Sequence, residues 1–214
     1  MPEAQTPTPA PASPSLPTPV DRELLAAQLP TPIDWPAIFG RQAPLVVELG
    51  CGSGRFIIGQ AEAHPELDFV AVERAGEYFQ LLKERVGKRP LPNMRVLKTD
   101  ATTLVARFPA ACVQTYHIYF PDPWPKKRHH KRRLIQPAFC AQLKRTLAHD
   151  GRLFFATDHA AYCTEAVPRL EAEFAVTHHP GPWEDAPLGR TNYEIKYMKV
   201  DRPIWRYSAL QKST

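Results

Sequence analysis

The chain has few of the features that mark secreted, membrane-spanning or metal-stabilised proteins. Its 214 residues include four cysteines with no C-x-x-C spacing, which argues against a zinc knuckle or a disulfide framework; they are Cys51, Cys112, Cys140 and Cys163. No apolar run approaches the roughly 20 residues that a membrane-spanning helix needs. The N-terminus carries no secretory pattern. These absences predict a cytoplasmic protein without a membrane partner.

Two ligand-binding patterns are also missing. Adjacent histidines at His129–His130 and His178–His179 point apart in extended or helical backbone, and neither pair has carboxylate or cysteine partners at ligand spacing. We therefore predict no metal site. The dinucleotide motif G-x-G-x-x-G is incomplete, because its third glycine would fall where the chain has Arg55.

Proline is concentrated at the start of the chain. Ten of the 24 prolines lie between Met1 and Pro36, and the early ones are mixed with Ala, Thr and Ser, a composition that buries too little apolar surface to order itself. This predicts a disordered tail over residues 1–20, an N-terminal arm over residues 21–44 that starts with a short helix, and one domain over residues 45–214.

Positive charge is local. The net charge is +5, but six of the 27 Lys and Arg residues lie between Lys126 and Arg133. Without these six, 21 basic residues face 22 acidic ones, which is close to neutral. A compact basic run in an otherwise balanced chain is typical of a surface that binds a polyanion.

A glycine turn follows the first apolar run. Residues 45–49 are predicted as a strand and residues 55–64 as a helix, with Gly50, Gly52 and Gly54 between them. Such a turn lets the backbone approach a ligand closely. Glu48, two residues before the first glycine, would repel a pyrophosphate but attract the ammonium and sulfonium charges of S-adenosylmethionine.

Further acids end the next predicted strands. Residues 68–73 end at Glu73, residues 94–102 contain Asp100, and residues 151–158 end at Asp158. Helices are predicted over residues 132–149 and 160–174, a strand over residues 174–179, and a last strand from Tyr193 that pauses and resumes over residues 204–210. The alternation predicts an α/β fold with a doubly wound, mostly parallel seven-stranded sheet and an antiparallel edge hairpin, its acids sharing one edge.

The stretch from Thr115 to Arg133 departs most from an ordinary α/β domain. A strand ends at Phe120, and Pro121, Pro123 and Pro125 then prevent its continuation. Asp122 and Trp124 lie between these prolines, and the basic run follows at once. An aromatic side chain, a carboxylate and a row of cations suit a nucleobase on its phosphate backbone.

These motifs resemble class I S-adenosylmethionine-dependent methyltransferases of the Rossmann-like fold, and within them the bacterial tRNA (guanine-N7)-methyltransferase family. The resemblance covers about residues 45–210 and rests on ELGCGSG at 48–54, FPDPWPKKRHHKRR at 120–133, ATD at 156–158 and TNYE at 191–194. The glycine motif is common to many methyltransferases, whereas the second motif is highly specific. Pro125 stands where some members have His, and the proline-rich extension is outside the family core.

The resemblance implies a set of site residues. It implies methyl transfer from S-adenosylmethionine to N7 of a variable-loop guanine in tRNA, leaving S-adenosylhomocysteine, with no DNA partner and a monomer or homodimer as the active form. Asp122 is the implied catalytic residue. Cofactor contacts are implied for Glu48, Gly50, Glu73, Asp100 and Asp122; substrate contacts for Lys126, Asp158, Thr191, Asn192, Tyr193 and Glu194; and RNA contacts for Arg128, His129, His130, Lys131, Arg132 and Arg133.

Two other functions stay open from the sequence. One is an amino-group methyltransferase acting on adenine or a protein amide, which has Asn or Asp, two prolines and an aromatic residue at the corresponding strand exit; here a single proline separates Asp122 from Trp124. The other is an RNA-binding protein that has kept the fold without activity. The intact glycine turn and the four acids favour an active enzyme.

Overall fold

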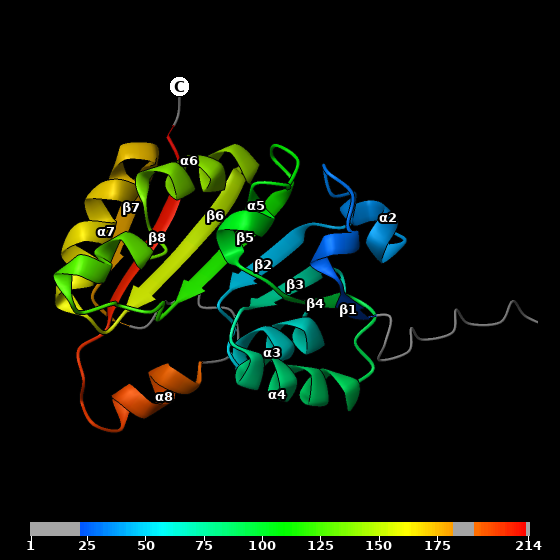
Figure 1. Ribbon diagram of the computed structural model, residues 1–214, viewed down its shortest axis with the longest axis horizontal. Helices are drawn as coiled ribbons and strands as arrows, with labels where there is room; N and C mark the ends of the chain where they lie inside the picture. Colours follow the sequence, from blue (N-terminus) through cyan, green and yellow to red (C-terminus); the bar gives the residue numbers. More distant parts are fainter. Residues whose placement is uncertain (1–21, 182–190, 213–214) are drawn as a thin grey trace, which may run out of the picture.

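In the computed structural model, residues 22–181 and 191–212 are described. The tail predicted for residues 1–20 lies outside this part of the chain. Figure 1 shows one sheet with helices on both of its faces. No helix of the described residues is long and apolar enough to cross a bilayer.

Eight strands of the described residues form the sheet, in the order β1-β4-β3-β2-β5-β6-β8-β7. They are β1 Glu23–Leu24, β2 Leu45–Leu49, β3 Asp68–Glu73, β4 Met94–Lys98, β5 Val113–Tyr119, β6 Leu147–Thr157, β7 Phe174–His179 and β8 Trp205–Gln211. β8 pairs antiparallel with both β6 and β7, and the other pairs are parallel. The predicted fold class is confirmed, and the two-residue β1 adds an eighth strand to the seven predicted.

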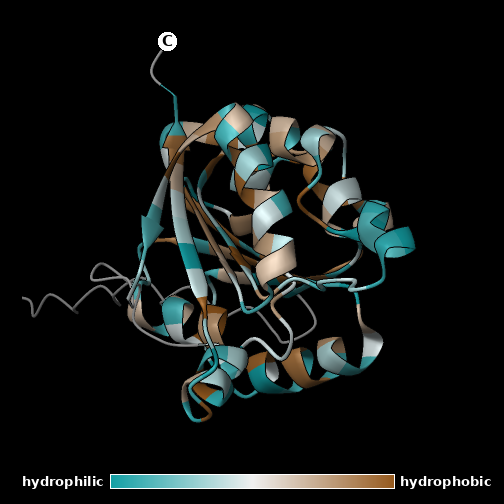
Figure 2. Ribbon diagram, turned by 90° about the vertical axis from the view of Figure 1, so that its left-hand side faces the viewer, coloured by the Kyte–Doolittle hydropathy of each residue, from teal (hydrophilic) through white to brown (hydrophobic). Residues whose placement is uncertain are grey.

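Helices cover both faces because strand side chains alternate between them. The helical segments are η1 Ala26–Gln28, α2 Trp35–Phe39, α3 Arg55–Ala63, α4 Gly76–Gly87, α5 Ala101–Val105, η2 Lys127–Arg132, α6 Pro137–Thr146, α7 Ala160–Glu173 and α8 Asn192–Met198. Val47 and Val70 pack with residues of α5, α6 and α7, whereas Val46 and Ala71 pack with residues of α3 and α4. Figure 2 shows the strands between these helix layers.

The order of the strands in the sheet determines where the candidate site lies. The chain runs outward from β2 through β3 to β4, then returns to pair β5 with the other side of β2. The carboxyl ends of β2 and β5 therefore meet at the point where the winding reverses, which is where open α/β sheets bind ligands. The glycine turn follows β2 and the Asp122 turn follows β5, so the fold brings the two motifs together.

Two predicted helices have different bounds in the structure. The helix expected over residues 132–149 is α6, which begins only at Pro137, because Gln136 before it is extended (φ −114°, ψ 154°) as residues preceding proline usually are. The short helix expected at the start of the arm is reduced to the 3-10 turn η1, because Glu23 and Leu24 pair with β4 instead. An available sheet edge has overridden the local helical preference.

Candidate active site

The glycine turn leaves open space at two of its three glycines. Gly50, Gly52 and Gly54 have φ of +80°, +56° and +76°, values that L side chains rarely adopt. A Cβ on Gly50 or Gly52 would meet no atom within 4 Å, whereas one on Gly54 would lie 2.3 Å from Cδ1 of Leu82 in α4. The first two glycines thus expose backbone to a ligand, and the third lets α3 pack on α4.

Glu48 and Glu73 project from neighbouring strands toward the α3 and α4 side. Glu48 is 3% exposed; its carboxylate accepts a hydrogen bond from the Ile57 N–H, yet its Oε2 has no partner among the described residues. Burial raises the pKa of Glu48 well above its usual value, the Ile57 N–H opposes this, and the negative charge of Glu73 adds to the rise. A cationic ligand group would relieve this repulsion.

Glu73 holds the glycine turn. Its Oε2 accepts from the Gly52 N–H at 2.8 Å and its Oε1 from the Ala75 N–H at 2.7 Å. A carboxylate has about four lone-pair sites, so each oxygen can still accept from a ligand hydroxyl.

Asp100 caps α5 at the end of the next strand. Its Oδ1 accepts from the Thr102 N–H at 2.9 Å and the Thr102 hydroxyl at 2.5 Å, and Arg74 lies 3.8 Å from its Oδ2. Partial burial alone would raise the pKa of Asp100, but the bonds from Thr102 and Thr103 and the charge of Arg74 outweigh burial and lower it. The carboxylate is therefore ionised at neutral pH.

The turn after β5 presents Asp122 to solvent. Phe120 and Trp124 have φ of 50° and 43°, so the backbone is in the left-handed region on both sides of the acid. Asp122 is exposed, and its negative charge acts on Tyr193 of α8. A hydrogen bond with Tyr78 raises the pKa of Tyr193 to about 12, with smaller contributions from burial and from the charge of Asp122.

The segment from Tyr193, predicted as the start of a strand, belongs instead to the helix α8, Asn192–Met198. The Thr191 hydroxyl accepts from the Glu194 N–H at 3.0 Å, which is the capping contact of a T-x-x-E sequence and the signal that the strand prediction overlooked. Asn192 donates to the Ser53 hydroxyl at 3.0 Å, and Glu194 forms a buried ion pair with Arg206 of β8 at 2.8 Å. The structure thus docks α8 against the glycine turn.

Asp158, which is also predicted to contact the substrate, directly follows β6. It forms an ion pair with Arg202 at 2.6 Å and a hydrogen bond with Tyr197 of α8. The sequence analysis did not identify Tyr78, Tyr197 or Arg206 as site residues, because none of them lies in a chemically distinctive motif. Tyr197 is part of α8, and Tyr78 and Arg206 contact Tyr193 and Glu194 of that helix.

The basic run folds into η2, a 3-10 helix in which side chains three apart lie on the same side. His129 and Arg132 both contact Trp124: the His129 ring centroid is 5.9 Å from that of Trp124, and the Arg132 guanidinium carbon is 5.1 Å from it. The indole proposed for base stacking therefore already has an arginine over one face.

The next pair, His130 of η2 and Arg133 directly after it, faces Glu165 of α7. His130 Nδ1 lies 2.7 Å from Oε1 of Glu165, and Arg133 Nη1 lies 3.0 Å from Oε2. The Arg133 side chain is 0% exposed, so it presents no accessible surface for the RNA contact predicted for it. A basic run is normally solvated, and the three-residue period of η2 turned this arginine inward.

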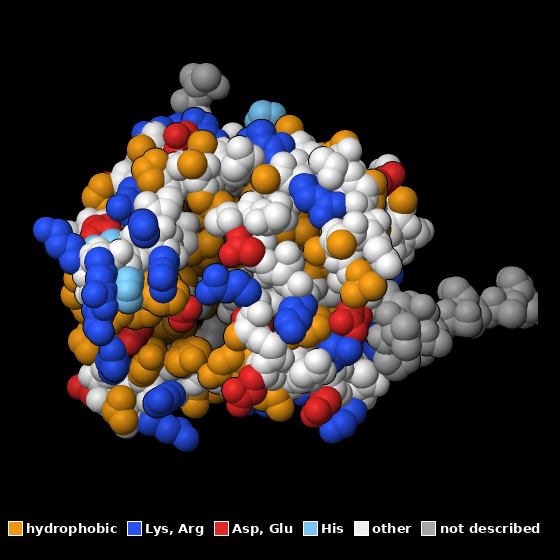
Figure 3. Space-filling model, in the orientation of Figure 1, with side chains coloured by type: hydrophobic (Ala, Val, Ile, Leu, Met, Phe, Trp, Pro, Cys, Tyr) orange, Lys and Arg blue, Asp and Glu red, His pale blue; other side chains and the backbone are white. Residues whose placement is uncertain are grey.

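The exposed cations of the run that contact neither Trp124 nor Glu165 form a surface that we call the basic ridge. It consists of Lys126, Lys127, Arg128 and Lys131, all exposed. Figure 3 shows Lys and Arg side chains gathered along the edge of the molecule that carries η2, beside a hollow with acidic side chains. Asp122 precedes the ridge by four residues in the chain, so the two lie next to each other.

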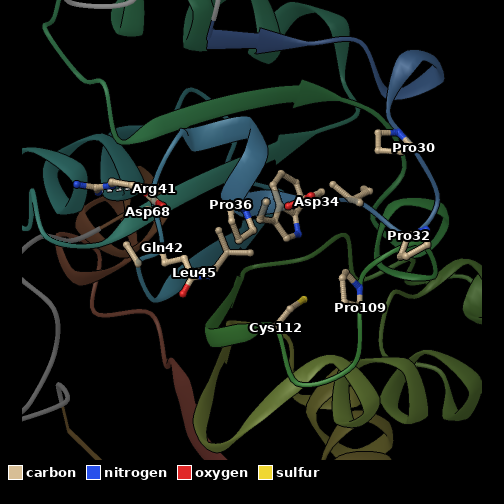
Figure 4. Close-up of a pocket in the computed structure, with 13 residues that line it drawn as sticks. Pro30, Pro32, Asp34, Pro36, Arg41, Gln42, Leu45, Asp68, Pro109 and Cys112 are labelled. Atoms are coloured by element: carbon tan, nitrogen blue, oxygen red, sulfur yellow. Dashed lines mark hydrogen bonds and ion pairs between the residues drawn. The ribbon is translucent and has the colours of Figure 1, made fainter. Parts of the chain in front are cut away.

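A separate hollow of about 770 Å³ lies at the amino ends of the strands, where Leu45 and Asp68 begin β2 and β3 (Figure 4). Prolines of the arm line it, and Arg41 and Asp68 form an ion pair at 2.7 Å on its wall. It contains none of the predicted site residues and is not the candidate active site.

The fold and the acid-lined glycine turn at the winding reversal define a class I methyltransferase. Solved structures agree on the fold. The 16S rRNA methyltransferase KamB has a TM-score of 0.59 at 15% identity, covering 81% of this chain and 90% of that one. The antibiotic-resistance methyltransferase Kmr has a TM-score of 0.55 at 20% identity, covering 81% and 89%.

Sequence comparisons identify the family within this class of enzymes. The family described as "Putative methyltransferase" matches residues 42–207. The tRNA (guanine-N(7)-)-methyltransferase of Chromohalobacter salexigens is 41% identical, over 79% of this chain and 72% of that protein, and the one of Exiguobacterium sp. is 34% identical, over 83% and 84%. The chain belongs to the tRNA (guanine-N7)-methyltransferase family.

Proposed function

We propose that this protein transfers the methyl group of S-adenosylmethionine to N7 of a guanine in the variable loop of tRNA, in the cytoplasm. The observation that carries the proposal is the position of the acid-lined glycine turn directly beside the Asp122 turn and the basic ridge. Relatives named for this activity share most of the chain. We propose Asp122 as the catalytic residue.

The residues at the glycine turn fit a cationic methyl donor. The unpartnered Oε2 of Glu48 is suited to the donor's ammonium group, and the space at Gly50 and Gly52 admits the donor next to the backbone. Glu73 and Asp100 are suited to ribose hydroxyls and an adenine amino group. When bound, S-adenosylmethionine supplies an electrophilic methyl group on sulfur.

Asp122 need not remove a proton, because guanine N7 carries a lone pair and no hydrogen. We assign Asp122 to accepting hydrogen bonds from the N1–H and N2–H₂ groups of the guanine, or to stabilising the positive charge that the base acquires. Its exposure and its proximity to Tyr193 suit a residue that meets an incoming base. Alignment of this kind contributes roughly 7 to 11 kcal/mol to lowering a barrier.

For the remaining contacts, we propose two groups with different roles. Lys126, Arg128 and Lys131 would bind phosphates, with His129, His130 and Arg132 shaping the same loop around Trp124 and Glu165. Asn192, Tyr193 and Asp158 would line the guanine site, while Thr191 and Glu194 hold α8 through its cap and through Arg206.

The decisive test uses unmodified tRNA and methyl-labelled donor. After digestion to nucleosides, we expect labelled N7-methylguanosine, mapped to the variable loop. Labelled N6-methyladenosine, or label in protein amides, would favour an amino-group methyltransferase. No transfer together with no donor binding in calorimetry would favour an inactive RNA-binding protein.

The basic ridge leads to a prediction about salt. Replacing Lys126, Arg128 and Lys131 together with Gln should reduce the slope of log Kd for tRNA against log salt concentration by about 2 to 3, since each phosphate contact contributes roughly 0.7 to 0.9. The matched control replaces Lys88, Arg152 and Lys212, exposed cations at the other end of the sheet, and should leave the slope unchanged. If the ridge variant has the same salt slope as the control variant, the basic ridge does not contact the phosphates of tRNA.

A further inference from the structure

The turn that carries Asp122 needs support from outside itself. Phe120 and Trp124 are non-glycine residues with positive φ, a strained conformation, and the prolines between and beside them lack N–H donors. Phe120 donates to the Ala156 carbonyl at 2.8 Å, which fixes the start of the turn on β6. The end of the turn is fixed by a side chain.

That side chain is Arg133. Its Nε donates to the Pro123 carbonyl at 2.8 Å, and its Nη1 donates to the Ala161 carbonyl in the first turn of α7 at 3.2 Å. Its guanidinium carbon lies 5.1 Å from the ring centroid of Tyr162. A fully buried guanidinium therefore joins the residue after Asp122 to a helix of the core.

Glu165 holds this guanidinium in place. Its carboxylate contacts Arg133 at 3.0 Å, His130 at 2.7 Å and Arg169 at 3.4 Å. Slight burial favours the neutral acid, but the charges of Arg133, His130 and Arg169 outweigh it and lower the pKa of Glu165. The carboxylate is therefore ionised at neutral pH and gives Arg133 a counter-charge on α7.

We propose that Arg133, oriented by Glu165, is a positioning residue for methyl transfer that sets the direction of the Asp122 carboxylate through the Pro123 carbonyl. The proposal rests on the role proposed above for Asp122. Small displacements of a reacting group, on the order of 1 Å, lower rates about 10²-fold. Arg133 thus acts on the reaction without touching RNA or the methyl donor.

The first test compares Arg133→Lys with Arg95→Lys. Arg95 is a matched control because it is also buried, also donates to backbone carbonyls (Pro92 at 2.8 Å, Ile38 at 3.0 Å) and also lies over an aromatic ring, that of Phe39, but at the amino end of β4. We expect Arg133→Lys to lower the single-turnover rate, per folded molecule and at saturating tRNA and donor, by about 10- to 100-fold. Arg95→Lys should lower Tm while changing this rate less than about twofold.

Two further measurements separate the alternatives. The salt slope of tRNA binding should equal that of the unaltered protein in Arg133→Gln, which removes the charge; a decrease of about 0.7 to 0.9 would mean that Arg133 contacts a phosphate and would overturn the proposal. In the Asp122→Asn background, Arg133→Lys should have little additional effect on the rate, because both act through one group. A full additional loss there would show that Arg133 acts independently of Asp122.

A second variant covers the case in which Arg133→Lys folds poorly. Glu165→Gln alters a half-buried side chain and leaves the Arg133 bond to Pro123 possible, so we expect a smaller decrease, about 3- to 10-fold, with an unchanged salt slope. An unchanged single-turnover rate in a folded Arg133→Lys or Glu165→Gln variant would overturn the proposal. If the unaltered protein does not methylate tRNA in the same assay, the proposed function fails rather than the role of Arg133.

Discussion

Asp122→Asn should lower kcat/KM for tRNA methylation by about 10²- to 10³-fold. The amide keeps the shape of the side chain but removes its charge, and its NH₂ group faces the guanine N–H donors that the carboxylate accepts. Losing one pre-organised charged contact to a developing charge typically has an effect of this size. Single-turnover kinetics and calorimetry with the methyl donor would separate the rate of transfer from donor binding.

Asp150→Asn is the matched control. Asp150 is an exposed acid toward the amino end of β6, so this variant makes the same change of charge at the opposite end of the sheet and should be as active as the unaltered protein. A tRNA with inosine at the target position lacks the N2 amino group. If Asp122 accepts from N2, the losses caused by inosine and by Asp122→Asn will not add. Unchanged turnover by Asp122→Asn, with normal tRNA binding, contradicts the role assigned to Asp122.

Gly54→Ala should destabilise the fold by about 2 to 4 kcal/mol. The residue has φ of +76°, and the new Cβ would lie 2.3 Å from Cδ1 of Leu82, a fully buried core residue. Left-handed backbone costs an L-residue about 1–2 kcal/mol, and overfilling a packed core costs about 1–3 kcal/mol. Because Gly54 is the N-cap of α3, movement there also disturbs the turn that receives the methyl donor.

Gly59→Ala in the interior of α3 is the control for this change. A Cβ at Gly59 meets no atom within 4 Å, and alanine favours helix over glycine, so stability should rise by about 0.5–1 kcal/mol. Urea denaturation of both variants gives the comparison. A Gly54→Ala protein as stable as the unaltered one would mean that the Leu82 side chain can move away freely.

Most of the parallel sheet was predictable because its strands are buried on both faces. β2 and β3 have the predicted bounds, Leu45–Leu49 and Asp68–Glu73, since continuous apolar runs between polar turns leave little choice of register. The positions of the glycine turn and of the acids at the strand ends were predictable from the same strand pattern. Here local pattern and tertiary environment agree.

The parts that the sequence reading missed depend on tertiary contacts. Arg133 belongs to a basic run of the kind that is normally solvated. Its burial arises because it directly follows η2, three residues after His130, and shares with His130 the side that faces Glu165, which is 32 residues away in the chain. Similarly, TNYEIKYM alternates well enough for a strand, but the Thr191 cap and the Glu194–Arg206 ion pair select a helix. Neither outcome is contained in composition or periodicity.

The position of β8 also bears on when the enzyme becomes competent during its synthesis. β7 precedes β8 in the chain, yet within the described sheet it pairs only with β8, which lies between β7 and β6. A nascent chain that ends before Trp205 therefore has no strand on which β7 can form its ladder, and it lacks Arg206 to hold α8 beside Ser53. Activity should therefore first arise once β8 has left the ribosome, and a chain truncated before Trp205 should lack it.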